Sequence, residues 1–134
     1  MSKTGFLLVG HGSKKPYNKK LIDNTAELIA KKEADYIVKS AFMENSSPTI
    51  EEMLDEFRKE DIESLVVVPL FLARGVHIDE DIPGILGLEE GSHKGVFTLE
   101  SGEIPLIYAR PIGENPMLAD LMITSAKRAV EEHL

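Results

Sequence analysis

The order of apolar segments along the chain predicts an α/β domain built on a parallel sheet. Four short apolar runs alternate with segments of helical periodicity, which is the pattern of strands joined by right-handed helical crossovers. The first and third runs are almost continuously apolar, as expected of strands that are buried on both faces of a sheet. With 134 residues and no internal repeat, the chain is expected to form one domain over 1–134.

The predicted strands are short, and three of them are rich in β-branched or aromatic residues. They are expected at residues 6–9, 36–42, 65–72 and 105–108. Pro69 interrupts the third strand, and proline cannot donate to a strand ladder. Regular pairing should therefore stop or bulge at that residue.

Apolar residues at helical spacing predict the intervening helices. These are expected within about 17–33, from Ile50 to Phe57, near 77–88, and from Pro116 through Ala129. Ser47 is expected to cap the second helix, with Pro48 in its first turn. Each apolar stripe, that of the last helix included, is about as wide as a face that packs on a sheet.

The segment 84–103 does not fit the alternation, because it holds five glycines among polar residues. Such a stretch is expected to be a mobile loop or a small insertion, with room for a hairpin. His93 lies within it and His133 lies near the C-terminus. Both histidines are expected to be exposed to solvent.

Composition narrows the classes of function. Lys and Arg number 15 against 23 Asp and Glu, so the net charge is −8, which disfavours nucleic-acid binding. No apolar run approaches the roughly 18 residues that a membrane span needs. The absence of cysteine excludes disulfides and thiolate metal sites and favours the cytoplasm. Any metal must then be held by His, Asp, Glu or backbone oxygen.

Polar residues gather where the predicted strands end. In open parallel sheets, ligands bind beyond the carboxyl ends of the strands. The residues expected at this edge are His11 and Ser13, Glu44, Arg74 and His77, and Arg110. Ser13 falls at the entry to a helix, where free N–H groups could hold a carboxylate.

Simpler interpretations exist for each candidate. His11 lies between two glycines that permit a sharp turn, so it could be only a strand-end residue. His77 could face solvent at the start of a helix, and exposed glutamates such as Glu44 are common. Together the three are more informative, because the predicted topology brings them to one edge. Two imidazoles and a carboxylate suit divalent Co, Ni, Zn, Cu or Fe.

Other motifs around the first histidine fail. Histidine phosphatases need Arg immediately before the histidine, where this chain has Gly10. The dinucleotide-binding fingerprint needs glycine where this chain has Lys15. A reaction that needs both metal ligands and acceptors for two protons is the insertion of a metal into a tetrapyrrole. Histidine can serve in both roles.

Three segments carry a resemblance to a known family. They are Leu8-Val9-Gly10-His11-Gly12-Ser13, then Phe42-Met43-Glu44 with Ser47-Pro48-Thr49-Ile50, and Val68-Pro69-Leu70-Phe71-Leu72-Ala73-Arg74-Gly75-Val76-His77 with Asp81-Ile82-Pro83. Over residues 5–113 the chain resembles the class II chelatases. Its length is similar to the short, archaeal-type sirohydrochlorin cobaltochelatases within that family.

The resemblance implies a flavodoxin-like chelatase domain with a four-stranded parallel sheet flanked by helices. It implies a homodimer that inserts Co²⁺ or Ni²⁺ into sirohydrochlorin, a tetrapyrrole with eight carboxylates, without ATP or an organic cofactor. His11 and His77 match the family's active-site histidines, and Glu44 matches an acidic metal position. An acidic protein needs local cations for such a substrate, and Arg74 or Arg110 could grip its carboxylates.

Two other functions use the same sequence features. A non-catalytic carrier of metal or tetrapyrrole would bind one equivalent without turnover. A flavodoxin-like regulatory domain would bind no Co²⁺ at all. Turnover therefore separates the first alternative from a chelatase, and metal binding separates the second.

Overall fold

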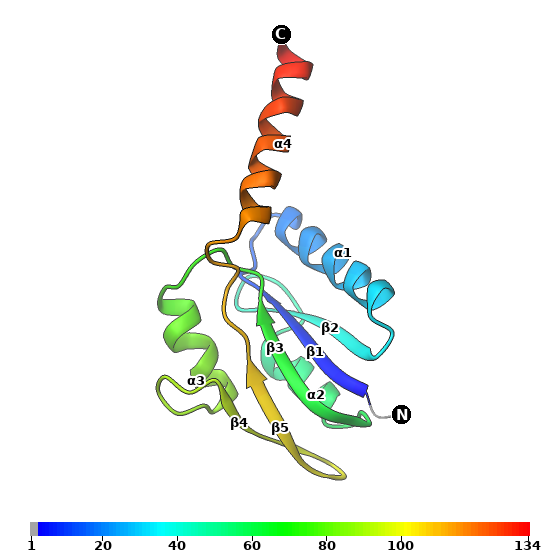
Figure 1. Cartoon of the computed structure of the whole chain (residues 1–134). Helices are drawn as coiled ribbons and strands as arrows, with labels where there is room; N and C mark the ends of the chain where they lie inside the picture. The colour runs from blue at the N-terminus through cyan, green and yellow to red at the C-terminus, as the bar shows by residue number, and fades with distance from the viewer. Residues whose placement is uncertain (1–2) are drawn as a thin grey trace.

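Five strands form one mixed sheet in the computed structural model, which describes residues 3–134 (Figure 1). The strands are β1 (Lys3–Gly10), β2 (Tyr36–Phe42), β3 (Ile62–Pro69), β4 (Lys94–Leu99) and β5 (Gly102–Tyr108). Their order is β2-β1-β3-β5-β4. The first four in that order run parallel, and β4 pairs antiparallel with β5 at the edge. The predicted α/β class is confirmed.

The prediction of four strands missed β4, which lies inside 84–103. That segment contains the end of a helix, a turn and β4, and β4 forms a hairpin with β5. In β4 only Phe97 and Leu99 are buried, and Thr98 between them faces solvent. An edge strand with so few apolar positions gives a weak signal in sequence. The third strand ends at Pro69, as its missing N–H predicts.

Three helices, α1 (Pro16–Lys32), α2 (Ile50–Phe57) and α3 (Ile82–Leu86), cover the two faces of the sheet. The last helix, α4 (Pro116–His133), stands apart from them. Ile22 and Ala26 of α1 pack with Leu8 and Phe42 on one face. The larger core lies on the other face, where α2, α3 and the turn before α3 cover β1, β3 and β5.

The N-terminus of α2 corrects one prediction. Thr49, not Ser47, caps the helix, with its hydroxyl accepting from the N–H of Glu52 at 3.2 Å. The Glu52 carboxylate accepts from the Thr49 N–H in return, which completes a capping box. The helix starts at Ile50, so the residue directly before it is the one placed to cap.

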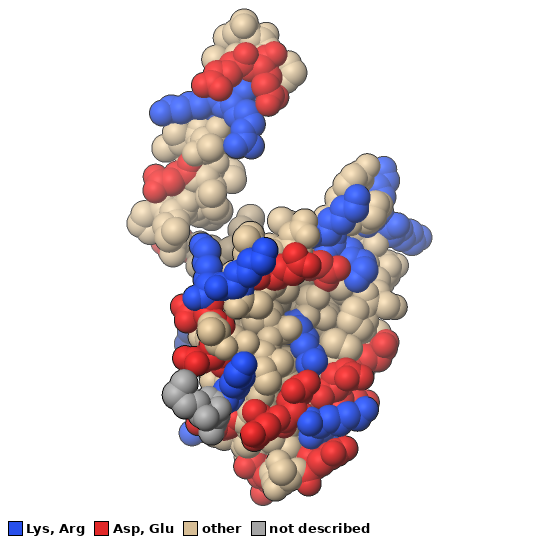
Figure 2. Space-filling view, turned by 90° about the vertical axis from the view of Figure 1, so that its right-hand side faces the viewer, with Lys and Arg blue, Asp and Glu red and all other residues tan. Residues whose placement is uncertain are grey.

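The last helix does not pack on the sheet, which contradicts the prediction. None of its residues is buried, and it projects away from the body of the protein (Figure 1). Figure 2 shows it standing clear of the body, with uncharged surface along much of its length. The loop that leads into it is joined to the loop after β3 by two hydrogen bonds, Ile112 N–H to Phe71 O and Gly113 N–H to Leu72 O. Across residues 3–134, none of the helices combines the length and hydropathy that a membrane crossing requires.

Candidate active site

The loops after β1 and β2 are joined by backbone hydrogen bonds. The N–H of Met43 donates to Gly10 O, and the N–H of Glu44 donates to His11 O, both at 3.1 Å. Gly12 has a left-handed φ of +90°, and a Cβ placed there would lie 1.7 Å from the Glu44 carbonyl oxygen. Only glycine permits this close approach. It fixes the Glu44 backbone beside the loop that carries His11.

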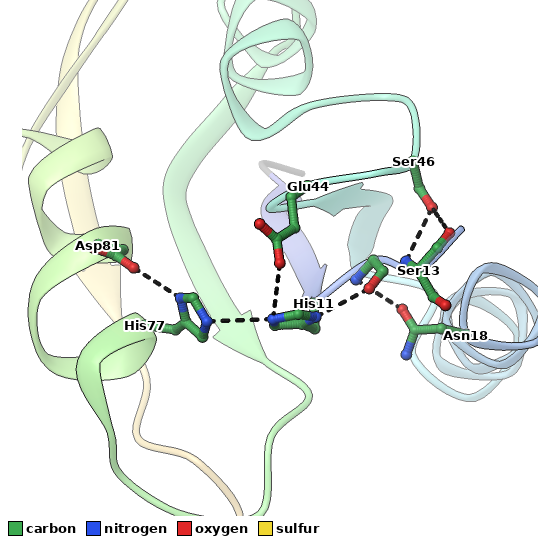
Figure 3. Close-up of polar contacts among 8 residues, drawn as sticks. His11, Ser13, Asn18, Glu44, Ser46, His77 and Asp81 are labelled. Atoms are coloured by element: carbon green, nitrogen blue, oxygen red, sulfur yellow. Dashed lines mark hydrogen bonds and ion pairs between the residues drawn. The ribbon is translucent and has the colours of Figure 1, made fainter. Parts of the chain in front are cut away.

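Three predicted site residues meet at this edge of the sheet (Figure 3). Nε2 of His11 lies 3.2 Å from Nε2 of His77 and 3.3 Å from Oε1 of Glu44. The three side chains are 41–52% exposed, so the site is open to a ligand from solvent. The topology therefore unites residues that are 66 positions apart in the chain.

Hydrogen bonds to the outer nitrogens orient both rings. Nδ1 of His11 lies 3.0 Å from Gly12 O and donates to it, while Nδ1 of His77 donates to Oδ2 of Asp81 at 2.7 Å. Each Nε2 is thereby turned toward the other ring. Two nitrogen lone pairs at this separation repel each other unless a proton or a metal cation lies between them. The arrangement is therefore suited to a cation.

The site is a chain of groups rather than a closed cage. Within residues 3–134, no three His, Asp or Glu side chains are already arranged as a metal-binding cluster. His11 stands between its two partners and contacts each of them. Sites that keep open positions are typical of metals that react, whereas structural sites are closed. This openness suits a metal that must be passed to another ligand.

Sequence reasoning missed two residues of the site. Asp81 was given no role at the site, yet its carboxylate accepts from Nδ1 of His77. Its spacing of four from the histidine was the available signal. Phe71 was assigned to the third strand, but it follows that strand and its ring packs near both imidazoles, with centroids 6.2 Å from His11 and 6.5 Å from His77.

Ser13 lies on the side of the site formed by the β2 loop. Its N–H faces the Ser46 hydroxyl at 3.5 Å, and that hydroxyl donates to Ser13 O at 3.2 Å. The Ser13 hydroxyl accepts from the N–H of Lys15. The N–H expected to be free for a carboxylate therefore already faces a serine, which a ligand would have to displace.

Arg74 and Arg110 line a separate cavity of about 1160 Å³. It is bounded by residues 74–84, the segment that carries His77, together with parts of 88–93 and 108–113. Nε of Arg74 lies 3.3 Å from the Asp79 carboxylate, and the Arg74 side chain is 79% exposed. Arg74 lies three residues before His77 in the chain, and neither arginine is hydrogen-bonded to the two histidines.

One further prediction is wrong: His93 is half-buried rather than exposed. Its Nδ1 donates to the Tyr108 carbonyl at 2.7 Å, and its ring stacks on that of Tyr108. Burial, and to a lesser extent the charge of Asp79, raises the pKa of Tyr108 to about 12. The prediction for His133 is confirmed, since its side chain is 78% exposed.

Fold and site together define the class: an α/β protein that presents two imidazoles and a carboxylate for a cation at the carboxyl edge of a parallel sheet. The CbiX family description matches residues 5–129. The chain belongs to the CbiX family, which confirms the resemblance seen in the sequence.

Individual relatives agree with this assignment. The chain is 45% identical to a protein named sirohydrochlorin cobaltochelatase from Methanococcoides burtonii, over 92% of this chain and 95% of the relative. A protein of the same name from Methanosarcina acetivorans is 44% identical over 96% of this chain and 98% of its own length.

Two solved structures are also similar. One is a putative cobalamin biosynthesis CbiX protein from Marinobacter aquaeolei, with a TM-score of 0.69, 26% identity and coverage of 96% and 98%. The other is the sirohydrochlorin chelatase SirB from Bacillus subtilis in complex with cobalt, with a TM-score of 0.59 and 28% identity. That match covers 63% of this chain and 36% of SirB.

Proposed function

We propose that this chain is a sirohydrochlorin chelatase, a cytoplasmic enzyme that inserts Co²⁺ into sirohydrochlorin without ATP or an organic cofactor. The proposal takes residues 1–134 as one chelatase domain. The observation that carries it is the pair of Nε2 atoms 3.2 Å apart, with Glu44 beside them, in a chain whose relatives bear this name. Cobalt in the SirB complex supports the choice of metal.

His11 and His77 would hold the incoming metal ion through Nε2, and Glu44 would provide an oxygen ligand. Imidazole nitrogen and carboxylate oxygen both bind divalent first-row metals, and open positions remain for the pyrrole nitrogens. As the metal passes to the macrocycle, each Nε2 that releases it becomes free to accept one pyrrole proton. One M²⁺ enters and two protons leave, so the charge balances.

The same donor set would accept Ni²⁺. Affinity at a shared nitrogen site generally rises from Co²⁺ to Ni²⁺, so binding strength alone does not select cobalt. We therefore expect measurable insertion of both ions by the purified protein. The supply of each metal would then decide which product is made.

Arg74, Arg110 and Ser13 are proposed to hold the substrate's carboxylates. Bidentate pairing of a guanidinium with a carboxylate is stronger than an ordinary hydrogen bond. Arg74 is partly neutralised by Asp79, so Arg110 should contribute more of the attraction. The net charge of −8 makes such local cations necessary for an anionic substrate.

A homodimer is proposed because α4 exposes large apolar side chains. Five large apolar residues of this helix are 52–71% exposed: Met117, Leu121, Met122, Ile123 and Val130. Large apolar side chains exposed in this number on one helix indicate an interaction site. The loop before α4 is hydrogen-bonded to Phe71 and Leu72, next to the metal-binding edge. A second copy packed on the start of α4 would therefore lie close to that edge.

The test is an anaerobic absorbance time course with trace protein, excess sirohydrochlorin, and either Co²⁺ or Ni²⁺. Many turnovers per chain above a protein-free control are expected. A single stoichiometric burst would indicate a carrier. If metal insertion were not accelerated and the protein bound no metal, the regulatory-domain alternative would be favoured.

A further inference from the structure

The turn that carries His77 is wider than an α-helical turn. Residues His77–Asp81 form a π-turn, in which the N–H of Ile82 donates to His77 O. The next hydrogen bond in that series would need an N–H at position 83, where Pro83 has none. The Ile78 carbonyl therefore has no main-chain donor from this series.

Tyr108 provides the missing donor from β5. Its side chain is buried, and its hydroxyl donates to the Ile78 carbonyl at 2.8 Å. Because its pKa is raised to about 12, the hydroxyl keeps its proton at any physiological pH. Buried carbonyls are rarely left without a partner. This hydroxyl is therefore the group that allows the turn to keep its unusual shape.

The ring of Tyr108 is itself held in place. His93 stacks on it with centroids 5.5 Å apart and planes 13° apart. Backbone bonding reinforces the pair, since the Tyr108 N–H donates to His93 O and the His93 Nδ1–H donates to Tyr108 O. The Tyr108 side chain is therefore held in one orientation, with its hydroxyl directed at the turn.

The shape of the turn determines where Asp81 lies. A wider turn contains more residues per revolution, so the fourth residue after His77 comes closer to alignment with it. The carboxylate of Asp81 accordingly reaches Nδ1 of His77 at 2.7 Å. That hydrogen bond sets which nitrogen of the ring carries the proton and which one faces His11.

We propose that Tyr108 is a positioning residue: its hydroxyl holds the π-turn, which keeps Asp81 on Nδ1 of His77 and Nε2 of His77 directed at His11. The proposal deepens the chelatase function and rests on it only for the kinetic readout. Tyr108 touches neither histidine of the site. Its effect should therefore fall on metal handling and not on recognition of the macrocycle.

Tyr108→Phe removes the hydroxyl and keeps the ring. We expect kcat to fall about 10-fold, the lower end of the range for groups that orient a metal ligand, with KM for sirohydrochlorin unchanged. Nitrogen-15 NMR of the imidazoles should show His77 changing from one tautomer to a mixture. Tyr36 on β2 is also half-buried and packs against Phe6, with ring planes tilted by 45°. Tyr36→Phe is therefore the matched control and should change neither quantity.

A His77 ring that keeps its single tautomer in Tyr108→Phe would overturn the proposal, whatever happens to activity. This readout needs no turnover, so it is independent of whether the chain is a chelatase. If the variant fails to fold, hydrogen exchange in the unmodified protein still tests the hydrogen bond of the Tyr108 hydroxyl. Its Tyr108 hydroxyl proton should exchange far more slowly than that of Tyr17, which is 72% exposed, and equal rates would refute the assignment.

Discussion

The two histidines of the site are held in different ways. His11 is fixed by backbone, because the β1 and β2 loops are hydrogen-bonded together and Gly12 allows their close approach. His77 is fixed by side chains, through the Asp81 carboxylate and the turn that Tyr108 supports. His11 should therefore be sensitive to changes of backbone shape, and His77 to the loss of single polar groups.

Removing either imidazole tests whether the two work as one unit. His11→Ala and His77→Ala should each lower chelatase activity by about 100- to 10,000-fold, the range for loss of a group that transfers protons. The double variant should be little worse than either single one, because residues that act together are not additive. The absorbance assay measures all three variants, with circular dichroism to show that they fold. Full activity in His11→Ala would refute the mechanism.

The backbone support of His11 is tested at Gly12. Gly12→Ala places a methyl group against the Glu44 carbonyl and forces alanine into a left-handed conformation. Gly87→Ala is the matched control, with φ +73° and no atom within 4 Å of the added carbon. Left-handed strain alone costs about 1–3 kcal/mol of unfolding free energy.

Gly12→Ala should lose more stability than this in urea titrations, and most of its activity. Gly87→Ala should lose only the strain energy. Equal losses in the two variants would show that the contact between the β1 and β2 loops does not matter. In that case the backbone contact between the two loops would not hold His11 in place.

The side-chain support of His77 is tested at Asp81. Asp81→Asn should weaken Co²⁺ binding or turnover by about 10- to 100-fold, because groups that orient a ligating histidine have effects of that size. Calorimetric titration with Co²⁺ measures the affinity directly. The exposed neighbour Glu80, changed to Gln, removes the same charge without touching the ring. If both variants bound Co²⁺ equally well, the hydrogen bond to His77 would have no role.

The difference between the two supports also explains what could be predicted from sequence. Gly10-His11-Gly12 is a local pattern, and the strand order alone places Glu44 and His77 at the same edge. The spacing of four between His77 and Asp81 is a visible signal, but the π-turn that holds them depends on Pro83 and on a tyrosine of a distant strand, which no local pattern reveals. The wrong prediction that α4 packs on the sheet has a similar cause. An apolar stripe indicates that a helix packs against some surface, but it does not identify that surface.

The proposed substrate contacts should give a smaller effect, confined to KM. Arg110→Gln should raise KM for sirohydrochlorin several-fold with kcat unchanged, since a contact made equally in ground and transition states affects binding alone. Added salt should reduce the difference from the unmodified protein. Lys31→Gln, at the far end of α1, removes the same charge elsewhere and should leave KM unchanged. A fall in kcat at constant KM in Arg110→Gln would place this residue in the chemical step instead.

The smallest effect on the protomer itself is expected at α4, where no residue is buried. Leu121→Glu should leave the unfolding free energy of the isolated protomer within about 0.5 kcal/mol, as is usual for exposed positions. The same change puts a charge on the apolar surface proposed to join two copies, so sedimentation should show a shift from dimer to monomer. Leu28→Glu on α1, also more than half exposed, is the control and should keep the dimer.

Unchanged sedimentation of Leu121→Glu would mean that α4 is not the dimer contact. A monomer with full activity would mean that one protomer contains the whole site, whereas activity that returns as the protein concentration rises would mean that the partner completes it.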